Sequence, residues 1–326
     1  MPVTEQAIEV KLEDVVAAAE RIKGLAKRTP VMTSRLFDEA SGMNVFFKCE
    51  NLQSGGAFKI RGAANFLMSL SEAERKRGVV TYSSGNHAQA VAMAAAHLGM
   101  KAVIVMPTDA PKSKIESTRR FEPEIIFFDR FTQNREEIAG QVAFETGMVV
   151  VPSYDHAWIV AGQGTAALEL MEEQPDLDAI LVCLGGGGFL SGSAIVARAL
   201  RPATKVFGVE PELANDWNLS LKAGKRVAIA PPATIADGLR TIVPGELTFP
   251  IVQALSAGVI LVSEDEIRYT VRFMLSRMKM LTEPSGAVGA AAALHRRLPA
   301  GIQKLGVMIS GGNVDMDVLA EICAQA

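Results

Sequence analysis

Residues 179–192 read Ala-Ile-Leu-Val-Cys-Leu-Gly-Gly-Gly-Gly-Phe-Leu-Ser-Gly, an apolar run followed at once by four glycines. The unbroken apolar run predicts a strand buried on both faces, as in a parallel sheet. The glycines at 185–188 predict a tight loop that leads into a helix over residues 188–200. Because glycine has no side chain, several backbone N–H groups of such a loop can converge on a phosphate at the helix N-terminus. The stretch therefore predicts a strand, a phosphate-binding loop and a helix.

The same alternation of short apolar runs and longer Ala-rich segments extends through the chain. It predicts further strands at 45–49, 102–106, 125–128, 149–151, 206–209 and 306–309, and further helices at 12–27, 86–98, 135–146, 264–278 and 285–297. Such alternation favours an α/β fold with right-handed crossovers between parallel strands. We expect a large domain from residues 1–70 and 158–326, with a smaller domain, residues 71–157, inserted in it.

Composition excludes several classes of protein. With 49% hydrophobic and 21% charged residues in a chain of 326, extended disorder is excluded. A net charge of −3 offers no basic excess to nucleic acid. The three cysteines lie far apart, which argues against a zinc site or a disulfide framework. The first residues mix charges and lack an apolar signal core, and glycines interrupt the uncharged stretch 179–197, so we expect a cytoplasmic protein that does not span a membrane.

The glycine loop differs from the common nucleotide-binding patterns. No Gly-Lys-Ser/Thr follows it, which excludes the nucleoside-triphosphate P-loop. The dinucleotide pattern GxGxxG fails too, because Leu190 or Ser191 stands where its last glycine belongs. Glu210, however, ends the next predicted strand, where an acidic residue can bind a ribose. A nicotinamide-dependent oxidoreductase therefore stays as a remote alternative.

A lysine follows a second glycine-bearing loop. Residues 51–62 read Asn-Leu-Gln-Ser-Gly-Gly-Ala-Phe-Lys-Ile-Arg-Gly, and a helix is expected to begin near Lys59. The positive end of a helix dipole disfavours a protonated amine and lowers its pKa. A neutral amine is what imine formation requires. The alternative is an ordinary surface lysine.

Three further turns carry small polar residues. Residues 82–89 read Tyr-Ser-Ser-Gly-Asn-His-Ala-Gln, where free N–H groups suit a carboxylate, although Ser84 or Asn86 can equally be a helix N-cap and His87 a structural residue. Residues 309–315 contain Ser310, which is either a cap or a hydroxyl aimed at a ligand. Residues 283–286 are ambiguous in the same way: the serine there is a cap candidate, and Glu283 is either solvated or part of the site.

Together, an imine-forming lysine, a phosphate loop and a strand-end hydroxyl suggest pyridoxal phosphate. The chain resembles the fold-type II pyridoxal phosphate enzymes, specifically the serine/threonine dehydratase and serine racemase group, and within it the 3-hydroxyaspartate dehydratases. Ten motifs in order carry the resemblance: FFKCENLQ, AFKIRGA, SSGNHAQ, VMPTDAPKSK, AGQGTAALE, GGGGFLSG, EPELAND, ADG, EPSG and SGGNVD. The resemblance implies a tryptophan synthase β-like fold, with two open, twisted, mostly parallel sheets flanked by helices, and a homodimer.

The resemblance also implies roles for individual residues. Lys59 is the Schiff-base lysine that removes the α-proton, and Ser84 faces the opposite side of the cofactor. The cofactor-binding residues are Phe58, Lys59, Asn86, Gly185, Gly186, Gly187, Gly188, Glu283 and Ser310. The loop that binds the substrate carboxylate comprises Ser83, Ser84, Gly85, Asn86 and His87. A divalent cation, Mg²⁺ or alternatively Ca²⁺ or Mn²⁺, matches oxygen ligands from Glu210, the Ala214 carbonyl and Asp216.

These roles predict a dehydratase. It eliminates water from a β-hydroxy-α-amino acid (3-hydroxyaspartate, threonine or serine) and gives a 2-oxo acid and ammonia. The neutral hydroxyl of Ser310 would stabilise the carbanion less than a carboxylate would, which favours expulsion of the β-hydroxyl. Arg135, whose fork can hold a distal carboxylate if it faces the cleft, and Ala57, which replaces the serine usual in threonine dehydratases, both favour an acidic substrate. The alternative for Arg135 is an ordinary arginine on a helix surface. A serine or aspartate-type racemase with side dehydratase activity, in which Ser84 reprotonates the α-carbon, is the alternative.

Overall fold

Two mainly parallel sheets organise the chain, which a computed structural model describes over residues 8–110 and 112–324. Within these residues the larger sheet has six strands, in the order β1 (Val31–Met32), β2 (Asn44–Cys49), β10 (Lys304–Ile309), β7 (Ala179–Cys183), β8 (Lys205–Pro211) and β9 (Val259–Val262). Only the pairing of β1 with β2 is antiparallel. The smaller sheet is parallel throughout, in the order β5 (Glu124–Phe128), β4 (Ala102–Pro107), β3 (Val79–Tyr82) and β6 (Val149–Val150).

Helices surround both sheets. Their bounds are α1 (Leu12–Arg21), α2 (Arg35–Ser41), α3 (Lys59–Ser69), α4 (Glu72–Arg77), α5 (Asn86–His97), α6 (Lys112–Arg119), α7 (Arg135–Thr146), α8 (Ala157–Glu173), α9 (Gly188–Leu200), α10 (Asp216–Ala223), α11 (Thr248–Leu255), α12 (Glu264–Phe273), α13 (Pro284–Leu294) and α14 (Met316–Ala324). Short 3-10 turns are η2 (Glu50–Leu52), η3 (Ser54–Gly56), η4 (Glu212–Ala214) and η5 (Asp237–Leu239), and η6 (Met274–Met278) is a π-helix.

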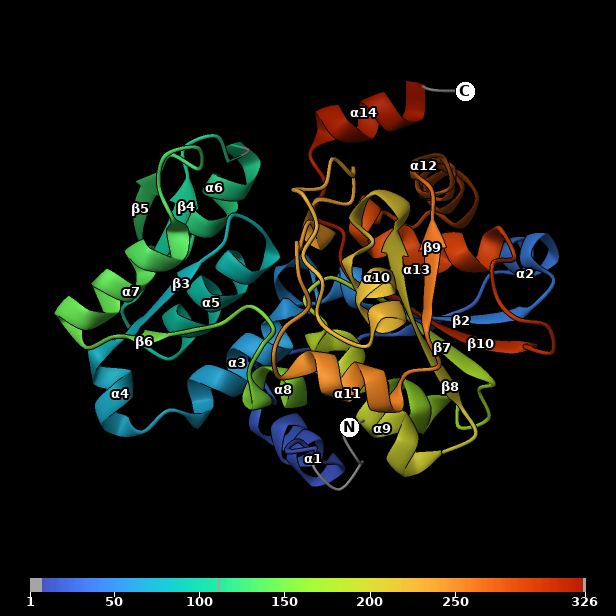
Figure 1. Cartoon of the computed structure of the whole chain (residues 1–326), viewed down its shortest axis with the longest axis horizontal. Helices are drawn as coiled ribbons and strands as arrows, with labels where there is room; N and C mark the ends of the chain where they lie inside the picture. Colours follow the sequence, from blue (N-terminus) through green and yellow to red (C-terminus); the bar gives the residue numbers. More distant parts are fainter. Residues whose placement is uncertain (1–7, 111, 325–326) are drawn as a thin grey trace.

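The two sheets occupy opposite halves of the molecule (Figure 1). Helices α4 to α7 accompany the smaller sheet, α9 to α13 accompany the larger one, and α3 and α8 lie between them. Glycines allow α8 to approach its neighbours closely: a Cβ on Gly162 would lie 2.6 Å from the backbone oxygen of Arg61, and one on Gly192 would lie 2.4 Å from that of Val160. The larger apolar core surrounds β7, whose five residues are all buried as its unbroken apolar sequence predicts.

The fold class is confirmed, and so is a strand or helix at each predicted segment, but two helix ends are wrong, and a third helix keeps its predicted end while its last turn is a π-helix. The helix expected over 12–27 ends at Arg21, because the chain turns at Gly24, whose φ is +86°. The helix expected to reach residue 278 changes at Phe273 into η6 and stops at Lys279, whose φ is +58°. The helix expected over 285–297 runs from Pro284 to Leu294.

All four strands of the smaller sheet come from residues 79–150. The domain boundaries at 70/71 and 157/158 stay a prediction. Among the residues that the structure describes, no helix is both long and apolar enough to cross a membrane. The start of the chain, from which we predicted that a signal peptide is absent, lies largely outside the described residues.

A buried ion-pair network joins α3 to β2 and α8. Arg61 is not exposed; its Nε donates to Glu50 at 2.7 Å, and its terminal nitrogens donate to Glu169 at 2.7 and 2.8 Å. Lys48, also buried, lies 2.7 Å from Glu169. Burial alone would raise the pKa of Glu50, but the Arg61 guanidinium outweighs burial and lowers it. The charges are therefore paired rather than isolated, which is what their burial requires.

We expect Glu50→Gln to lower the free energy of unfolding by about 3 kcal/mol, because the buried guanidinium of Arg61 then loses one of its two partner charges and keeps only Glu169. Urea unfolding of the apoprotein, followed by circular dichroism, measures the change. Glu72→Gln is the matched control, since Glu72 pairs with Lys76 on an exposed helix face and its loss should have no measurable effect. Equal stabilities of the two variants would contradict the assignment.

Candidate active site

Lys59 is the first residue of α3 and is partly buried. Its Nζ donates to the backbone oxygen of Ser153 at 2.8 Å. Burial lowers the pKa of the Lys59 amine to about 8, despite an opposing effect of Cys183. The backbone around the lysine is held as well: the Phe58 N–H donates to the Ser310 carbonyl at 3.0 Å. With a pKa of about 8, about a tenth of the Lys59 amine is neutral at pH 7, far more than for a lysine in water. The residue is also partly buried, so the surface-lysine alternative is wrong.

The glycine loop connects β7 to α9, as predicted. Within the described part of the chain, the N–H groups of residues 185–188 donate to no protein acceptor. Three of the loop's carbonyls, in contrast, accept a hydrogen bond, that of Gly187 from the Ser191 N–H at 2.8 Å. Trp217 Nε1 donates to the Gly185 oxygen at 2.5 Å, and Thr248 Oγ1 donates to the Gly186 oxygen at 2.7 Å. The first residues of α9 add further free N–H groups at the positive end of its dipole. The loop therefore offers donors to an anion, as a phosphate cradle requires.

The turn after β3 leads directly into α5. Gly85 is the N-cap of α5 and no side chain caps the helix, so the capping alternative for Ser84 and Asn86 is wrong. Asn86 is instead held at both ends of its amide. Its Nδ2 donates to Glu283 Oε1 at 2.8 Å, and its Oδ1 accepts from Asn313 Nδ2 at 2.9 Å. The partly buried turn keeps free N–H groups for a carboxylate.

His87 is buried, and its Nε2 lies 3.3 Å from the Val151 backbone oxygen. Burial, together with the nearby charge of Lys59, lowers the pKa of His87 to about 3. The imidazole is therefore neutral at physiological pH and cannot neutralise a substrate carboxylate through its side chain. Contacts with the carboxylate are therefore expected from the backbone N–H groups of this turn and from its uncharged side chains.

Ser310 is buried at the end of β10, and the next helix, α14, begins only at Met316, so Ser310 is not a helix cap. Its hydroxyl is hydrogen-bonded to the thiol of Cys183, which stands at the end of the neighbouring strand β7. Burial raises the pKa of Cys183 to about 11, so the thiol is neutral. Ser285 does not cap α13 either, because its Oγ accepts the Gly238 N–H at 2.9 Å.

Glu283 is buried rather than solvated, and it lies beside Asn86. Burial, assisted by the charge of Asp237, raises the pKa of Glu283 to about 8. Asp237 forms an ion pair with Lys114 of α6, which joins the two halves of the molecule at the edge of the site. The sequence predicted Glu283 as a cofactor-binding residue but gave no hydrogen-bond partner for it. In the structure its partner is Asn86.

Glu210 and Asp216 are both fully buried, at the end of β8 and the start of α10. Glu210 accepts the N–H groups of Trp217 and Asn218 at 3.3 and 2.9 Å, whereas both carboxylate oxygens of Asp216 have no partner. Burial raises the pKa of Glu210 to about 9 and that of Asp216 to about 7. A buried glutamate with these partners contradicts the ribose-binding alternative. Two buried carboxylates, of which Asp216 has both oxygens unpaired, fit a hard divalent cation, although within the described residues no cluster of three or more metal-ligating side chains occurs.

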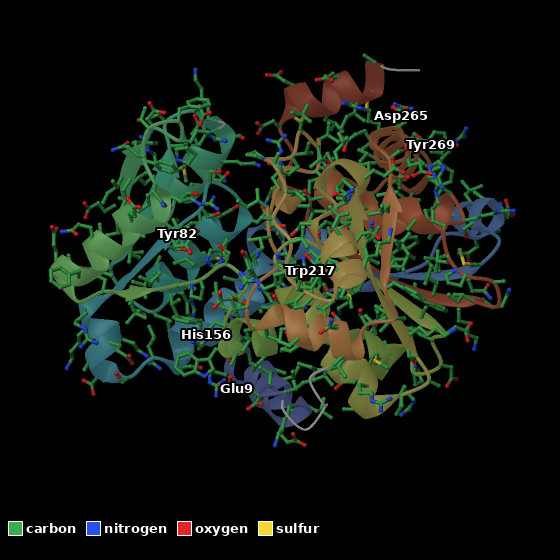
Figure 2. All side chains as sticks on the ribbon, viewed as in Figure 1. Glu9, Tyr82, His156, Trp217, Asp265 and Tyr269 are labelled. Atoms are coloured by element: carbon green, nitrogen blue, oxygen red, sulfur yellow. The ribbon has the colours of Figure 1, made fainter. Side chains whose placement is uncertain are left out.

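Arg135 is exposed at the first residue of α7. Its guanidinium lies over the ring of Tyr82, with 5.5 Å between the guanidinium carbon and the ring centroid. Tyr82 directly precedes Ser83 and belongs to the half of the molecule that holds the smaller sheet (Figure 2). The arginine is thus anchored next to the turn after β3.

Four residues that hold the glycine loop from outside, Tyr154, Asp155, Trp217 and Thr248, were not among the predicted site residues. The ring of Tyr154 packs on the loop, since a Cβ on Gly186 would lie 2.1 Å from it. Asp155 accepts the N–H groups of residues 246–248 at 2.8, 3.0 and 3.1 Å and so orients the start of α11. Trp217 and Thr248 complete the set. Of these four residues, the sequence indicated only Trp217, because it directly follows Asp216, a predicted cation ligand. The other three reach the loop through tertiary folding.

The residues present fit pyridoxal phosphate. The structure brings together a partly neutral amine on Lys59, unpaired N–H groups in the glycine loop and a neutral hydroxyl on Ser310. Phe58 stacks on Phe189 with 4.1 Å between ring centroids, which adds an apolar wall next to the lysine. Each group corresponds to one part of the cofactor: aldehyde, phosphate, pyridine nitrogen and ring face.

Comparison with known proteins gives a consistent result. Residues 22–311 match the family described as pyridoxal-phosphate dependent enzyme. The chain is 50% identical over 309 residues to the L-threo-3-hydroxyaspartate ammonia-lyase of a Pseudomonas species, with 95% of this chain and 97% of that protein covered. It is 46% identical over 313 residues to the serine racemase of Schizosaccharomyces pombe, with 96% and 97% covered. The structure of maize serine racemase superposes with a TM-score of 0.93 at 40% identity and covers 97% of each chain.

The lowered pKa of Lys59 predicts how cofactor uptake depends on pH. Only the neutral amine reacts, so the rate at which apoprotein takes up pyridoxal phosphate should rise about tenfold per pH unit below pH 8 and level off above it. Stopped-flow absorbance measures the rate, and Lys59→Arg should take up none covalently. A rate that keeps rising to pH 10 would contradict the lowered pKa.

Proposed function

The chain belongs to the pyridoxal-phosphate dependent enzymes, and from this premise we propose a lyase that acts on a β-hydroxy-α-amino acid. It eliminates water to leave an enamine, and hydrolysis of the enamine takes up one water and gives a 2-oxo acid and ammonia. The observation that carries the proposal is the amine of Lys59, partly buried at the start of α3 and with a pKa of about 8. An amine with this pKa is suited to both accepting and returning a proton near neutral pH.

Different residues of the chain carry out proton transfer, substrate binding and cofactor binding. Bound pyridoxal phosphate supplies an electron sink that makes the α-proton of the amino acid acidic. Lys59 accepts this proton and, as an ammonium, holds the proton that the departing hydroxyl needs to leave as water. The N–H groups of the turn after β3 bind the substrate carboxylate, and those of the glycine loop bind the cofactor phosphate. Asn86 is held by Glu283 and Asn313, and it would bind the cofactor's ring oxygen.

The pair of Ser310 and Cys183 favours elimination. Both groups are neutral, because the pKa of the thiol is raised to about 11 and the hydroxyl does not ionise. A neutral partner does not hold a proton on the pyridine nitrogen as a carboxylate would. The electron sink is therefore weaker, which favours rapid loss of the β-hydroxyl over slower reactions of the same α-carbon.

Among β-hydroxy amino acids we assign 3-hydroxyaspartate as the preferred substrate, with threonine and serine as weaker ones. Arg135 supports this assignment because it is anchored on Tyr82, next to the turn that binds the α-carboxylate. A guanidinium binds a second carboxylate through paired hydrogen bonds. The Pseudomonas relative is named for the same substrate.

We include a divalent cation, Mg²⁺ in the first place and Ca²⁺ or Mn²⁺ as alternatives, in the proposal. Glu210, the Ala214 carbonyl and Asp216 would hold it. The support is the pair of unpaired, buried oxygens of Asp216 beside a second buried carboxylate. A cation there would supply the positive charge that such a pair lacks.

We further propose a cytoplasmic homodimer. Leu52 and Leu281, 50% and 42% exposed, lie near each other, since Asn51 Nδ2 donates to the Leu281 oxygen at 2.8 Å. Adjacent exposed leucines are typical of a protein interface. In the described part of the chain Cys49, Cys183 and Cys323 are all free, which is typical of a reducing compartment. Sedimentation equilibrium tests the dimer.

A racemase side activity is the second candidate, and the position of Ser84 favours it. Ser84 lies in the turn after β3, caps no helix and is partly exposed, so its hydroxyl is available to a substrate. We expect Ser84→Ala to lower the rate at which L-serine is inverted about 100-fold, because a proton donor is lost. Ammonia release should change much less. Chiral chromatography and an ammonia assay measure the two rates, and a parallel loss of both would contradict a role of Ser84 in inversion alone.

The role of Arg135 predicts a change that depends on the substrate. We expect Arg135→Gln to lower kcat/KM for 3-hydroxyaspartate roughly 10- to 100-fold, because charge-assisted hydrogen bonds to the distal carboxylate are lost. The values for serine and threonine should stay within about threefold of wild type, since these substrates carry no second carboxylate.

Arg130→Gln is the matched control for that experiment. Arg130 is a neighbouring arginine that is 44% exposed and pairs with Asp109 at 2.7 Å. It should leave kcat/KM for all three substrates unchanged. Equal losses for serine and hydroxyaspartate in the Arg135 variant would exclude the distal-carboxylate role and leave a general dehydratase.

A further inference from the structure

Trp217 lies between two parts of the site that are otherwise separate. It is the second residue of α10, fully buried, and it occupies the central part of the molecule (Figure 2). Its backbone N–H donates to Glu210 Oε2 at 3.3 Å, and its indole Nε1 donates to the Gly185 oxygen at 2.5 Å. One residue thus bonds both to the candidate cation site and to the phosphate loop.

The indole also shapes the loop by contact. A Cβ on Gly187 would lie 2.4 Å from Cζ2 of Trp217, and the φ of Gly187 is +93°, so only glycine is accommodated there. Thr248 Oγ1 donates to the carbonyl of Gly186, so the carbonyls of Gly185 and Gly186 point toward Trp217 and Thr248. The N–H groups of the loop are consequently left for the cofactor phosphate.

The other end of the connection is the first turn of α10. Asp216 precedes Trp217 directly, and its two carboxylate oxygens are buried without a partner. Glu210 already binds this turn through the N–H groups of Trp217 and Asn218. A cation between the two carboxylates would therefore fix the turn from which the indole projects.

We propose that Trp217 is a positioning residue that couples the cation held by Glu210 and Asp216 to the phosphate loop, so that the cation slows release of the cofactor. The inference rests on the cation assigned under the proposed function. The coupling requires two hydrogen bonds from Trp217, one from its backbone N–H to Glu210 and one from its indole N–H to the Gly185 oxygen. Loss of the indole N–H alone removes the second bond and so breaks the coupling.

The test uses holoenzyme and measures the rate of cofactor release by absorbance, with Mg²⁺ and with chelator. We expect Mg²⁺ to slow release in wild type and Trp217→Phe to abolish this effect. With Mg²⁺ present, release should be about tenfold faster in the variant than in wild type, because a buried carbonyl of the loop loses its donor. Phe249→Leu is the matched control: Phe249 packs against Trp217, with 6.0 Å between ring centroids, but makes no bond to the loop. It should keep the Mg²⁺ effect.

A second measurement needs no change at Trp217. The chain has two tryptophans, and Trp158 is 39% exposed on α8, so Trp158→Phe leaves Trp217 as the sole tryptophan fluorophore. We expect Mg²⁺ to alter the emission of Trp217 over the same concentration range in which it slows cofactor release.

Three results would overturn the inference: an unaltered Mg²⁺ effect in Trp217→Phe, an equal loss of it in Phe249→Leu, or Trp217 emission that does not respond to Mg²⁺. If wild type itself shows no Mg²⁺ effect on cofactor release, the coupling is also excluded. The lyase reaction is measured separately by ammonia formation, so its own failure is distinguishable from a failure of the coupling.

Discussion

The buried guanidinium of Arg61 is the interaction on which the geometry of the site depends. It pairs with Glu50 after β2 and with Glu169 on α8, and it lies only two residues after Lys59. A buried guanidinium is tolerated only while its carboxylate partners neutralise it. The ion pairs of Arg61 therefore fix the position of the start of α3 relative to β2 and α8. The direction of the lysine follows from that placement. Backbone bonds then bring the same segment to β10, where Phe58 meets Ser310 and Ala57 pairs with Gly311.

Parallel strands explain why the remaining groups meet. The carboxyl ends of β7 and β10, neighbours in the larger sheet, deliver the glycine loop and Ser310 to one edge. The smaller sheet contributes the turn after β3, and Asn86 from that turn bonds with Glu283 and Asn313 of the other half. Lys114 and Asp237 form a second connection between the halves. The site is thus built at the junction of the two sheets, with groups from both.

Sequence patterns predict the parts of this arrangement that depend on local chemistry. The strand over 179–183 and the helix after it follow from an unbroken apolar run and four glycines, and the structure has both. Motif resemblance adds Lys59, and its burial in the structure lowers the pKa of the amine to about 8. Helix ends depend on single residues such as Gly24 and were placed wrongly.

Tertiary contacts limit what sequence can predict at the site. Tyr154 reaches the glycine loop from the connection between β6 and α8, more than 30 residues before the loop, and no spacing rule indicates it. Asp155 and Thr248 act through the start of α11, which the predicted elements did not include. The burial of Glu283 could not be predicted either, because its sequence neighbours indicate only that a helix starts there. These residues acquire their roles from packing between segments, not from their own sequence context.

Elimination of water is the central claim, and product analysis tests it most directly. Holoenzyme would be incubated with L-threo-3-hydroxyaspartate, L-threonine and L-serine, and separately with L-aspartate, which lacks the β-hydroxyl. The account predicts ammonia and the corresponding 2-oxo acid in equal amounts from the hydroxylated substrates, and neither product from aspartate. Absence of 2-oxo acid from all three hydroxylated substrates, with cofactor bound, would contradict it.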